Sequence, residues 1–416
     1  MGTERGEVIL VGASVRAAAG SALRAGLRPW AVDLFADVDL RVRCAARRLE
    51  EPYPEGFLTA LEAAPVAPLL YTGGLENHPQ LVDRLGARRV LWGNSGTSLR
   101  RAREPELLRA VAQEAGLPAP RGGPPDGSGR WLVKPLSGAG GHGIKPWEPA
   151  QSLPPRCHWQ EYIDGPSLSV VYVAAAGEAQ VVGTTWQLVG EAFLGAEAFH
   201  YCGSIGPVVL PAGLLARVRR LGARLAVSAQ LRGLFGVDGI LRDGDFWPVE
   251  VNPRYPASVE VLEHALGVQA LALHRVSCEE GRLMEVEVRP AAEMVGKAIL
   301  FARRGLRFPG QGPWEDDAYG RRAIDALPAF ADIPAEGEGI EAGHPVLTFF
   351  VRGADAEACR TALERGAASI ETALYAGEYQ EKERADEPER GGQSAGRDAG
   401  GASGSAADCP APDRGR

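Results

Sequence analysis

The sequence predicts a chain of mixed α/β and α+β domains: an N-terminal parallel sheet, a central region of antiparallel strands and a small C-terminal α+β block. Residues 8–12 and 29–35 are short apolar runs that flank a helical stretch, a strand–helix–strand unit that requires a parallel sheet. Residues 167–173 and 180–188 alternate in polarity like antiparallel strands. Strands also surround a glycine-rich loop and a tight hairpin, which gives these domains a candidate site.

Length and composition set the domain division. With 416 residues, 45% of them hydrophobic and 24% charged, the chain is too long for one small core. Turn-rich segments predict an N-terminal α/β domain over residues 1–96, a central domain over 97–289 and a C-terminal α+β block over 290–380. Residues 381–416 have almost no large apolar side chain, so we expect a disordered tail.

Charge and cysteine usage exclude several classes of partner. A net charge of −8 and a pI near 5.6 give no general attraction to nucleic acid or to an anionic membrane. The six cysteines lack CxxC or zinc-type spacing, which is typical of reduced cytosolic thiols. We see no signal peptide and no apolar run long enough for a membrane span. These features predict a cytoplasmic protein that binds neither nucleic acid nor membrane.

A polar loop follows the third predicted strand of the N-terminal domain, residues 67–71. Ligands of open α/β sheets lie beyond the carboxyl ends of the strands. Gly73 and Gly74 allow the backbone to come close to a ligand there, and Glu76 and Asn77 bring polar side chains. We therefore take Glu76 and Asn77 as candidate substrate residues; the alternative is a plain loop and helix cap.

Lys134 ends a predicted strand and leads into a glycine-rich loop. Only four of the 45 basic residues are lysine, so a lysine at this place suggests a need for a compact point charge. Loop glycines free backbone N–H groups to hold phosphates; a flexible surface loop is the alternative. The candidate phosphate-binding residues of the loop are Ser137, Gly138, Gly140, Gly141, His142 and Gly143.

Two further segments are weaker candidates. The extended stretch Glu161, Tyr162, Ile163 and Asp164 ends in a turn; its backbone could pair the edge of an adenine and its carboxylates could accept ribose hydroxyls. Residues 200–207 are predicted to form a polar-aromatic loop, and its members His200 and Tyr201 are candidate substrate residues. A lone histidine is more often structural than catalytic.

A predicted hairpin over residues 236–254 contains the candidate metal-binding residues. Glu250 and Asn252 point to one face of their strand and offer the hard oxygen ligands that suit Mg²⁺. A three-residue loop over 243–245 would set Asp238 opposite Glu250, whereas a two-residue loop would turn it away. Arg254 follows the strand and can hold an anionic group. A solvated polar hairpin face is the alternative.

The set of motifs, over residues 1–375, resembles the ATP-grasp superfamily: Lys134 with its glycine loop, the Gln-Glu-Tyr-Ile-Asp-Gly stretch, and Asp238 with Glu-Val-Asn-Pro-Arg. Residues 331–348 look like the C-terminal domain of biotin-carboxylase-type members. The nearest resemblance is to the uncharacterised group of predicted ATP-dependent carboligases. The resemblance implies an ATP-grasp fold with an N-terminal Rossmann-like (pre-ATP-grasp) domain and a small C-terminal α+β domain.

The resemblance also implies roles. ATP would be bound by Lys134, the glycine loop and residues 161–164, and Mg²⁺, or Mn²⁺ in its place, by Glu250, Asn252 and Asp238. Arg254 and Lys134 would act on the transferred phosphoryl group. Family members have another nucleotide lysine where this chain has only arginine, and Arg103 is the candidate substitute. Relatives often dimerise, so a homodimer is one assembly that the resemblance allows.

The expected activity is an ADP-forming ligation that joins a small-molecule carboxylate to an amine, or to another nucleophile, through an acyl phosphate. Two alternatives remain open. A bicarbonate-dependent carboxylase would need a base beyond Arg254, where this chain has Ser258, with Glu260 displaced by two positions. A nucleotide-binding regulatory module without turnover is favoured by the missing lysine at Arg103.

Overall fold

The computed structural model describes residues 6–149, 152–287 and 291–386. The N-terminal part is a parallel sheet in the order β3-β2-β1-β4-β5, which confirms the predicted α/β fold. Its strands are β1 (Glu7–Val11), β2 (Arg28–Asp33), β3 (Ala45–Arg48), β4 (Leu69–Tyr71) and β5 (Leu91–Trp92). Its helices are α1 (Arg16–Arg24), α2 (Val38–Arg41), α3 (Gly56–Ala60), η1 (Leu61–Ala63), η2 (Leu75–Asn77) and α4 (Pro79–Gly86).

This sheet has helices on both faces because its strands carry apolar side chains on both faces. On β1, Val8 and Leu10 pack in the cluster that contains α1, whereas Ile9 and Val11 pack in the cluster that contains α3 and α4. Asp33 ends β2, and its carboxylate accepts hydrogen bonds from the backbone N–H groups of the turn that follows. Because β1 and β4 are parallel neighbours, their carboxyl ends meet at one edge of the sheet, where η2 carries Glu76 and Asn77.

A second, antiparallel sheet of eight strands has the order β13-β12-β9-β10-β11-β14-β18-β16. Its first strands are β9 (Ser167–Ala175), β10 (Glu178–Val189), β11 (Tyr201–Gly206), β12 (Gly233–Arg242) and β13 (Asp245–Asn252), with η3 (Ala192–Leu194) between β10 and β11. The loop expected over residues 200–207 is thus wrong: most of it is strand β11, whose ladders with β10 and β14 outweigh the low strand preference of its glycines.

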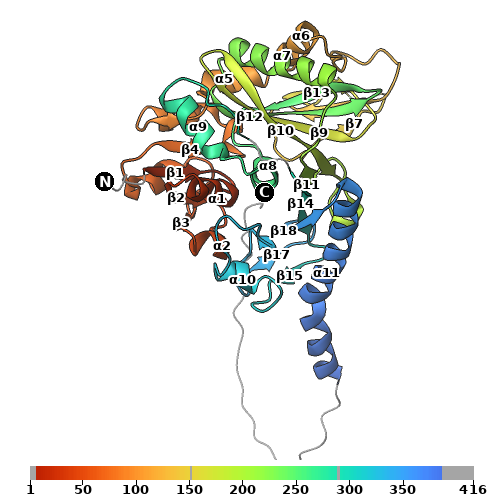
Figure 1. Cartoon of the computed structure of the whole chain (residues 1–416). Coiled ribbons are helices and arrows are strands. Elements are labelled where there is room, and N and C mark those ends of the chain that lie inside the picture. The colour runs from red at the N-terminus through yellow and green to blue at the C-terminus, as the bar shows by residue number, and fades with distance from the viewer. Residues whose placement is uncertain (1–5, 150–151, 288–290, 387–416) are drawn as a thin grey trace, which may run out of the picture.

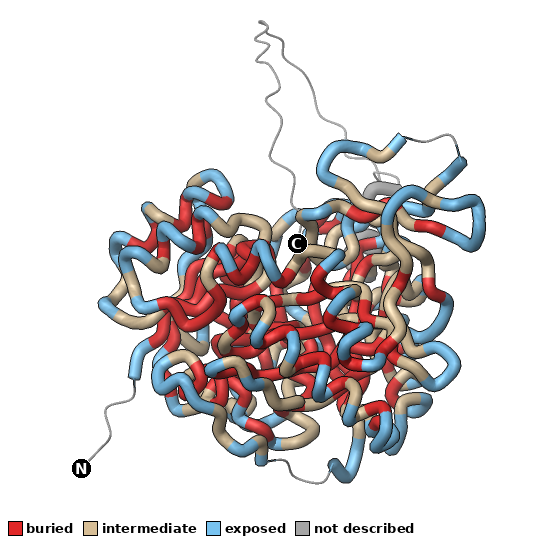
Figure 2. The backbone as a smooth tube through the Cα atoms, turned by 90° about the horizontal axis from the view of Figure 1, so that it is seen from above, coloured by how far each residue is buried: buried red, intermediate tan, exposed pale blue. Residues whose placement is uncertain are grey.

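Helices cover both faces of this sheet. On β9, Val170 and Tyr172 pack under α7 (Ala212–Ser228), which crosses the top of the sheet in Figure 1. Val171 and Val173 pack on the other face against α8 (Val259–Leu266) and α9 (Ala270–Glu279). Seen from above, Figure 2 shows buried residues running through the interior strands and exposed residues on the outer loops. The same two helices, α8 and α9, contact α1 and so join the sheet to the N-terminal domain.

A small antiparallel sheet stands beside the hairpin β12–β13. It consists of β7 (Lys145–Pro146), β6 (Trp131–Pro135) and β8 (Cys157–Glu161), in that order. Two helices, α5 (Gly96–Ala102) and α6 (Pro105–Glu114), lead into it. The side chain of Ser95 caps α5 by accepting a hydrogen bond from the N–H of Ser98, at 3.3 Å.

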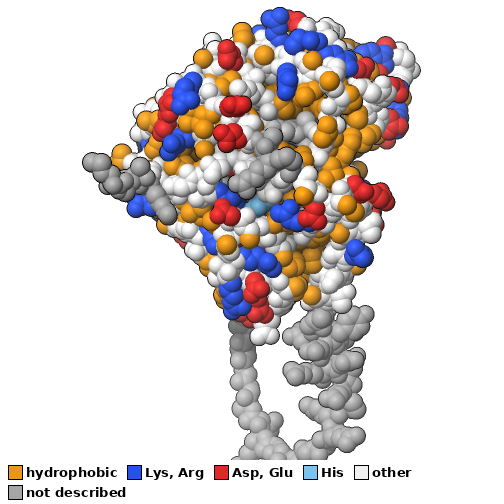
Figure 3. All heavy atoms as spheres, in the orientation of Figure 1, with side chains coloured by type: hydrophobic (Ala, Val, Ile, Leu, Met, Phe, Trp, Pro, Cys, Tyr) orange, Lys and Arg blue, Asp and Glu red, His pale blue; other side chains and the backbone are white. Residues whose placement is uncertain are grey.

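Basic side chains gather at the top of the molecule, where α6 and α7 lie (Figure 3).

The C-terminal block continues the eight-stranded sheet, because β14 pairs with β11 and β18 pairs with β14. Its elements are β14 (Met294–Phe301), β15 (Leu306–Arg307), α10 (Glu315–Ala318), β16 (Phe330–Ala331), β17 (Gly339–Ile340), β18 (Pro345–Gly353) and α11 (Ala356–Asp386). The division at residues 96, 289 and 380 stays a proposal. Helix α11 runs to Asp386, and residues 387–416 of the expected tail lie outside the described part of the chain.

Within the described ranges, no helix combines the length and apolarity that crossing a membrane requires. Five of the six cysteines lie in these ranges and are free thiols.

Candidate active site

The hairpin β12–β13 places Asp238 directly opposite Glu250, although its loop has only the two residues Asp243 and Gly244. The prediction that a two-residue loop would turn Asp238 away was wrong, because it took no account of a β-bulge. The ladder shifts by one residue between Asp238 and Gly239, so that Val249 is the extra residue on β13. The bulge restores the register that a three-residue loop would have given.

Oxygen donors gather on one face of this hairpin. Asp238 Oδ1 accepts a hydrogen bond of 2.7 Å from Ser169 Oγ, and its Oδ2 accepts one of 2.7 Å from Asn252 Nδ2. Burial raises the pKa of Asp238, and the neighbouring Glu250 carboxylate acts in the same direction. A divalent cation bound here would relieve the repulsion that the Glu250 carboxylate exerts on Asp238. Ser169 was not predicted; its place opposite Asp238 on β9 follows only from the strand pairing.

Lys134 reaches the same region from β6. Its Nζ donates to Gln160 Oε1 at 3.1 Å and to the carbonyl oxygen of Val249 at 3.3 Å. Val249 is the extra residue of the β-bulge in the hairpin. Lys134 is 7% exposed, and within the described ranges it forms no ion pair. Burial lowers the pKa of Lys134, although Glu250 and Asp238 act against this effect. Among the described residues, Lys134 is therefore a buried cation without an ion-pair partner, and the Glu250 and Asp238 carboxylates lie near enough to favour its charge.

A cavity adjoins Lys134. It is lined by Arg103 at the end of α5, by Gln160 and His158 on β8, and by Glu250 on β13, with apolar walls from α6 and Trp159. Burial lowers the pKa of His158 to about 4, and Lys134 acts in the same direction. The cavity thus combines positive charge near Lys134, a carboxylate of the hairpin and flat apolar surface, which suits a nucleotide.

The glycine loop after Lys134 needs its glycines. Gly140, Gly141 and Gly143 have φ values of 62°, 86° and 77°, in the left-handed region. A Cβ at Gly141 would lie 1.8 Å from the carbonyl oxygen of Phe199. The other candidate residues of the loop are Ser137, Gly138 and His142.

The loop packs against the start of β11. The N–H of Tyr201 donates to the carbonyl of Gly140 at 2.9 Å, and the rings of His142 and His200 lie 4.0 Å apart. Burial lowers the pKa of His200, and His142 acts in the same direction. The hydroxyl of Tyr201 lies 2.9 Å from Ser204 Oγ. The two weak substrate candidates His200 and Tyr201 therefore support the glycine loop.

The stretch predicted to hold adenine and ribose lies at the end of β8. In the β6–β8 ladder Gln160 pairs with Leu132 and Glu161 with Trp131, so Glu161 points to the face opposite Lys134 and Gln160. The Glu161 carboxylate accepts two hydrogen bonds from Arg121, one from the backbone N–H at 3.0 Å and one from the guanidinium at 3.1 Å.

The neighbours of Glu161 are also engaged. Arg130 stacks over Tyr162 at 4.1 Å and lies 3.4 Å from the exposed Asp164, while Ile163 is buried. Their role in nucleotide binding stays a prediction. Gln160, which sequence reasoning passed over, is the residue of this stretch that contacts Lys134.

Arg254 lies between the hairpin and the N-terminal domain. Its Nε donates to Glu76 Oε1 at 3.0 Å, and its Nη2 donates to Asn252 Oδ1 at 3.0 Å. The Glu76 carboxylate is 2% exposed. Its neighbour Asn77 accepts hydrogen bonds from the N–H of Gly138 at 3.0 Å and from Arg103 at 2.6 Å. The structure thus places Glu76, Asn77 and Arg103 beside the hairpin and the glycine loop, and their roles in binding stay predictions.

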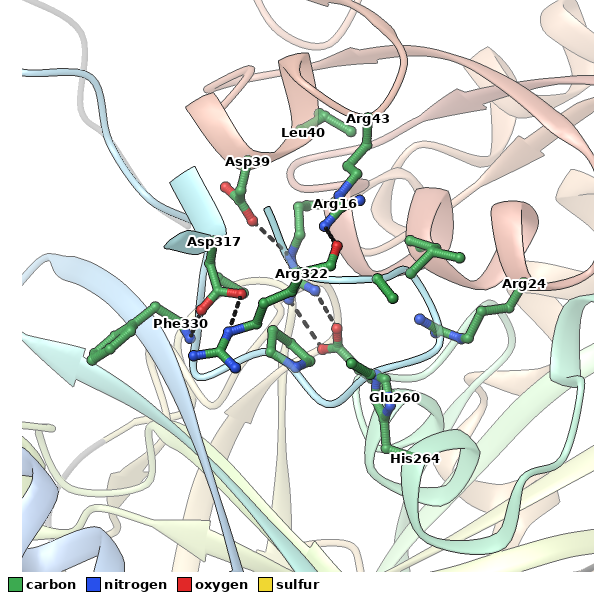
Figure 4. Close-up of a pocket in the computed structure, with 16 residues that line it drawn as sticks. Arg16, Arg24, Asp39, Leu40, Arg43, Glu260, His264, Asp317, Arg322 and Phe330 are labelled. Carbon is green, nitrogen blue, oxygen red and sulfur yellow. Dashed lines mark hydrogen bonds and ion pairs between the residues drawn. The ribbon is translucent and has the colours of Figure 1, made fainter. Parts of the chain in front are cut away.

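A second pocket lies between α1, α8 and the loop before β16 (Figure 4). At its base Glu260 pairs with Arg16 and, at 2.8 Å, with Lys297, and Arg16 also pairs with Asp332 at 3.2 Å. Although burial acts to raise it, the pKa of Glu260 is held well below its ordinary value by Arg16 and Lys297. Each charge has a buried partner, so this cluster joins the parts of the chain. Ser258 is buried at the start of α8.

Residues 107–258 match a family model described as ATP-grasp domain. A search of curated proteins finds no match. Among solved structures, the chain is similar to a biotin carboxylase from Campylobacter jejuni, with 14% identity, a TM-score of 0.63 and coverage of 83% of this chain and 87% of that one. It is also similar to an L-amino acid ligase from Bacillus licheniformis, with 16% identity, a TM-score of 0.63 and coverage of 88% and 98%.

A third similar structure is the biotin carboxylase domain dimer of the Hydrogenobacter thermophilus 2-oxoglutarate carboxylase, in complex with MgADP, ADP and bicarbonate. It has 13% identity and a TM-score of 0.61, over 89% of this chain and 90% of that one. At such identities the similarity concerns the fold.

Proposed function

We propose that this chain, which belongs to the ATP-grasp superfamily, is an ATP- and Mg²⁺-dependent ligase that joins a carboxylate to an amine, or to another nucleophile, with release of ADP and phosphate. The substrate carboxylate attacks the γ-phosphoryl group of ATP, and ADP leaves. The amine then attacks the carbonyl carbon of the acyl phosphate and displaces phosphate. Such transfer depends on positioning and electrostatics, so no strong nucleophile is required of the protein.

The single observation that carries this proposal is the buried ammonium of Lys134 beside the glycine loop, which forms no ion pair with any residue that the structure describes. A buried charge without a counter-ion is costly and is expected where a ligand supplies the opposite charge. The nearby N–H groups of the glycine loop are suited to anionic oxygens. A triphosphate meets both needs, with its oxygens on Lys134 and on the loop.

The hairpin fits Mg²⁺. It offers two carboxylates, Asp238 and Glu250, and the carboxamide of Asn252, all hard oxygen donors. The described part of the chain holds no group of three or more His, Cys, Asp or Glu side chains arranged for a metal, so the amide completes this set. When bound, Mg²⁺ supplies charge neutralisation on the phosphate oxygens. The raised pKa of Asp238 agrees with a site built for a cation.

We assign to Arg254 the orientation of the carboxylate or of the transferred phosphoryl group. Its guanidinium has five N–H donors, and described contacts to Glu76, Asn252 and the Tyr255 carbonyl use three of them. These contacts hold the planar fork in one orientation beside the metal donors. Its remaining donors and its positive charge can then serve an anionic substrate group.

A bicarbonate-dependent carboxylase, the first alternative, is less well supported. Ser258 cannot serve as a carboxylate base, and the nearest following carboxylate, Glu260, is held by Arg16 and Lys297. A base with a strongly lowered pKa is a weak proton acceptor. The residues that hold Glu260 therefore favour a structural role for it.

The test of this proposal measures ADP release by the purified chain with MgATP and a panel of carboxylates and amines. We expect ADP to form only when both substrates are present, and heavy oxygen from a labelled carboxylate to appear in the released phosphate. ADP release that depends on bicarbonate alone would support the carboxylase instead. Tight binding of ATP with no ADP release across the panel would support a regulatory module and contradict the ligase.

A further inference from the structure

We propose that Asn77 is a positioning residue that ties the glycine loop to the turn carrying Glu76, so that closure of the loop and orientation of Arg254 are coupled. This inference rests on the proposed function, because it assigns the loop to the nucleotide and Arg254 to the acceptor side. It gives Asn77 a role in coupling the two halves of the site, in place of the substrate contact expected from the sequence.

A closed set of hydrogen bonds surrounds Asn77. Its Oδ1 accepts from the N–H of Gly138 at 3.0 Å and from Arg103 Nη1 at 2.6 Å. Arg103 Nη2 donates to the carbonyl of Gly138 at 3.1 Å. The three residues come from η2, the end of α5 and the glycine loop. One amide oxygen, with two lone pairs, thus holds the loop and the arginine together.

Asn77 holds the glycine loop at Gly138, and β11 holds it at Gly140. The second contact is the hydrogen bond from the Tyr201 N–H to the Gly140 carbonyl, at 2.9 Å. Gly140 itself is exposed, and so is His142 beyond it. Without the Asn77 contact, the side of the loop near Lys134 would lose its described tie to the N-terminal domain.

Asn77 and Glu76 are consecutive residues on one short turn, η2. Leu75, at the start of η2, is fully buried, and Gly74 before it has a φ of 97°, where a Cβ would lie 2.7 Å from the Tyr53 hydroxyl. The turn is therefore tightly packed. Glu76 extends from it to Arg254, which contacts Asn252.

These contacts form an unbroken path from the nucleotide loop to the metal donors. It runs from Gly138 to Asn77, through the turn to Glu76, then to Arg254 and Asn252, and it ends at Asp238. A change in the loop that moves Asn77 must move Glu76, because the two residues are consecutive on a packed turn. The carboxamide of Asn77 thus couples closure of the glycine loop on the nucleotide to the orientation of Arg254.

The experiment measures hydrogen exchange of the peptides that cover residues 136–144 and 73–78, with and without MgATP, in the full chain. In the wild type we expect MgATP to slow exchange in both peptides. In Asn77→Ala we expect exchange of the loop to be about tenfold faster, the size expected for the loss of one hydrogen bond between neutral groups. We also expect MgATP to stop protecting residues 73–78. Unchanged exchange in both peptides would overturn the proposal.

Two further variants guard against a fold defect. Asn77→Asp keeps an acceptor oxygen for Arg103 and Gly138, so it should retain the slow exchange of the loop; if it behaves like Asn77→Ala, a hydrogen-bond tie is refuted. Gln80→Ala, at an exposed site on the first turn of α4, should match the wild type. Because MgATP alone is the probe, a wild type that closes its loop on ATP but never ligates would refute the proposed function and leave the role of Asn77 standing.

Discussion

Glu76 Oε1 accepts a hydrogen bond of 3.0 Å from Arg254 Nε, between residues 178 positions apart in the sequence. The Glu76 side chain is 2% exposed and that of Arg254 is 13% exposed. The pair joins the carboxyl edge of the N-terminal sheet to the end of the metal-type hairpin. A buried pair of this kind fixes geometry, and removing one member leaves the other charge uncompensated.

Replacing Glu76 therefore tests whether this pair holds the acceptor side. We expect Glu76→Ala to lower the free energy of unfolding by about 3–5 kcal/mol, since it leaves the buried Arg254 guanidinium without its ion-pair partner. Glu76→Gln keeps an acceptor oxygen and should lose less. Urea unfolding measures both variants, with Glu62→Ala, an exposed glutamate of the same domain, as the control. Equal stability of Glu76→Ala and the control would contradict the pairing.

Lys134→Met separates function from stability. Because the buried ammonium has no ion pair in the described structure, an apolar side chain of similar length should leave the free energy of unfolding unchanged or raise it. The same change should lower the rate of ADP release by about 10²–10³, as for loss of one preorganised electrostatic contact. Lys145→Met, at an exposed position, is the control. A variant that is strongly destabilised would show that Lys134 serves the fold.

Comparing Asp238→Asn with the wild type, with and without Mg²⁺, tests whether the hairpin binds the metal. Without Mg²⁺ the variant should unfold at a higher temperature than the wild type, since it loses the repulsion between Asp238 and Glu250 that contributes to the raised pKa. With MgATP the order should reverse, because the wild type gains more stabilisation by binding. Thermal unfolding with and without chelator measures both effects. Asp243→Asn at the exposed tip of the hairpin should behave like the wild type, and a similar Mg²⁺ shift in both variants would contradict the assignment.

Acid should weaken the fold between pH 6.5 and pH 4 through His274. Burial lowers the pKa of His274 to about 4, against an unfolded value near 6.5. Its Nδ1 accepts the N–H of Leu234 at 2.8 Å, a bond that protonation would break. The unfolded chain thus binds the proton first as the pH falls, and the contribution to stability, on the order of 3 kcal/mol, is present above pH 6.5 and lost toward pH 4.

Urea unfolding at a series of pH values measures this loss. The variant His274→Gln has no titrating ring at this position, so its free energy of unfolding should change less over the same window. A wild type and variant with parallel pH profiles would show that His274 does not carry the effect.

Much of the fold was predictable because its strands have clear local patterns. The apolar run of β1 and the alternation in β9 depend on neighbouring residues only. The strand β11 was missed because three of its features, two glycines and a small polar residue, argue against a strand, and its ladders come from distant strands. The continuation of the central sheet into β14 and β18 likewise depends on long-range pairing, which composition does not reveal.

The site could be predicted in part for the same reason. Lys134 is marked by the rarity of lysine and by the loop that follows, and the hairpin donors are marked by their alternation. The bulge at Val249 has no local signal, so the register of Asp238 could not be settled from the sequence. The contact of Gln160 with Lys134 needs the β6–β8 register, which also turns Glu161 to the other face.

The central claim is that Lys134 and the glycine loop bind the triphosphate of MgATP. Titration calorimetry of MgATP into the wild type and into Lys134→Met measures it directly, with Lys145→Met as the control. We predict that the wild type and the control bind MgATP alike and that Lys134→Met binds it at least ~100-fold more weakly, the loss expected for a buried charge–phosphate contact. Equal affinity of Lys134→Met and the wild type would contradict the assignment of the site.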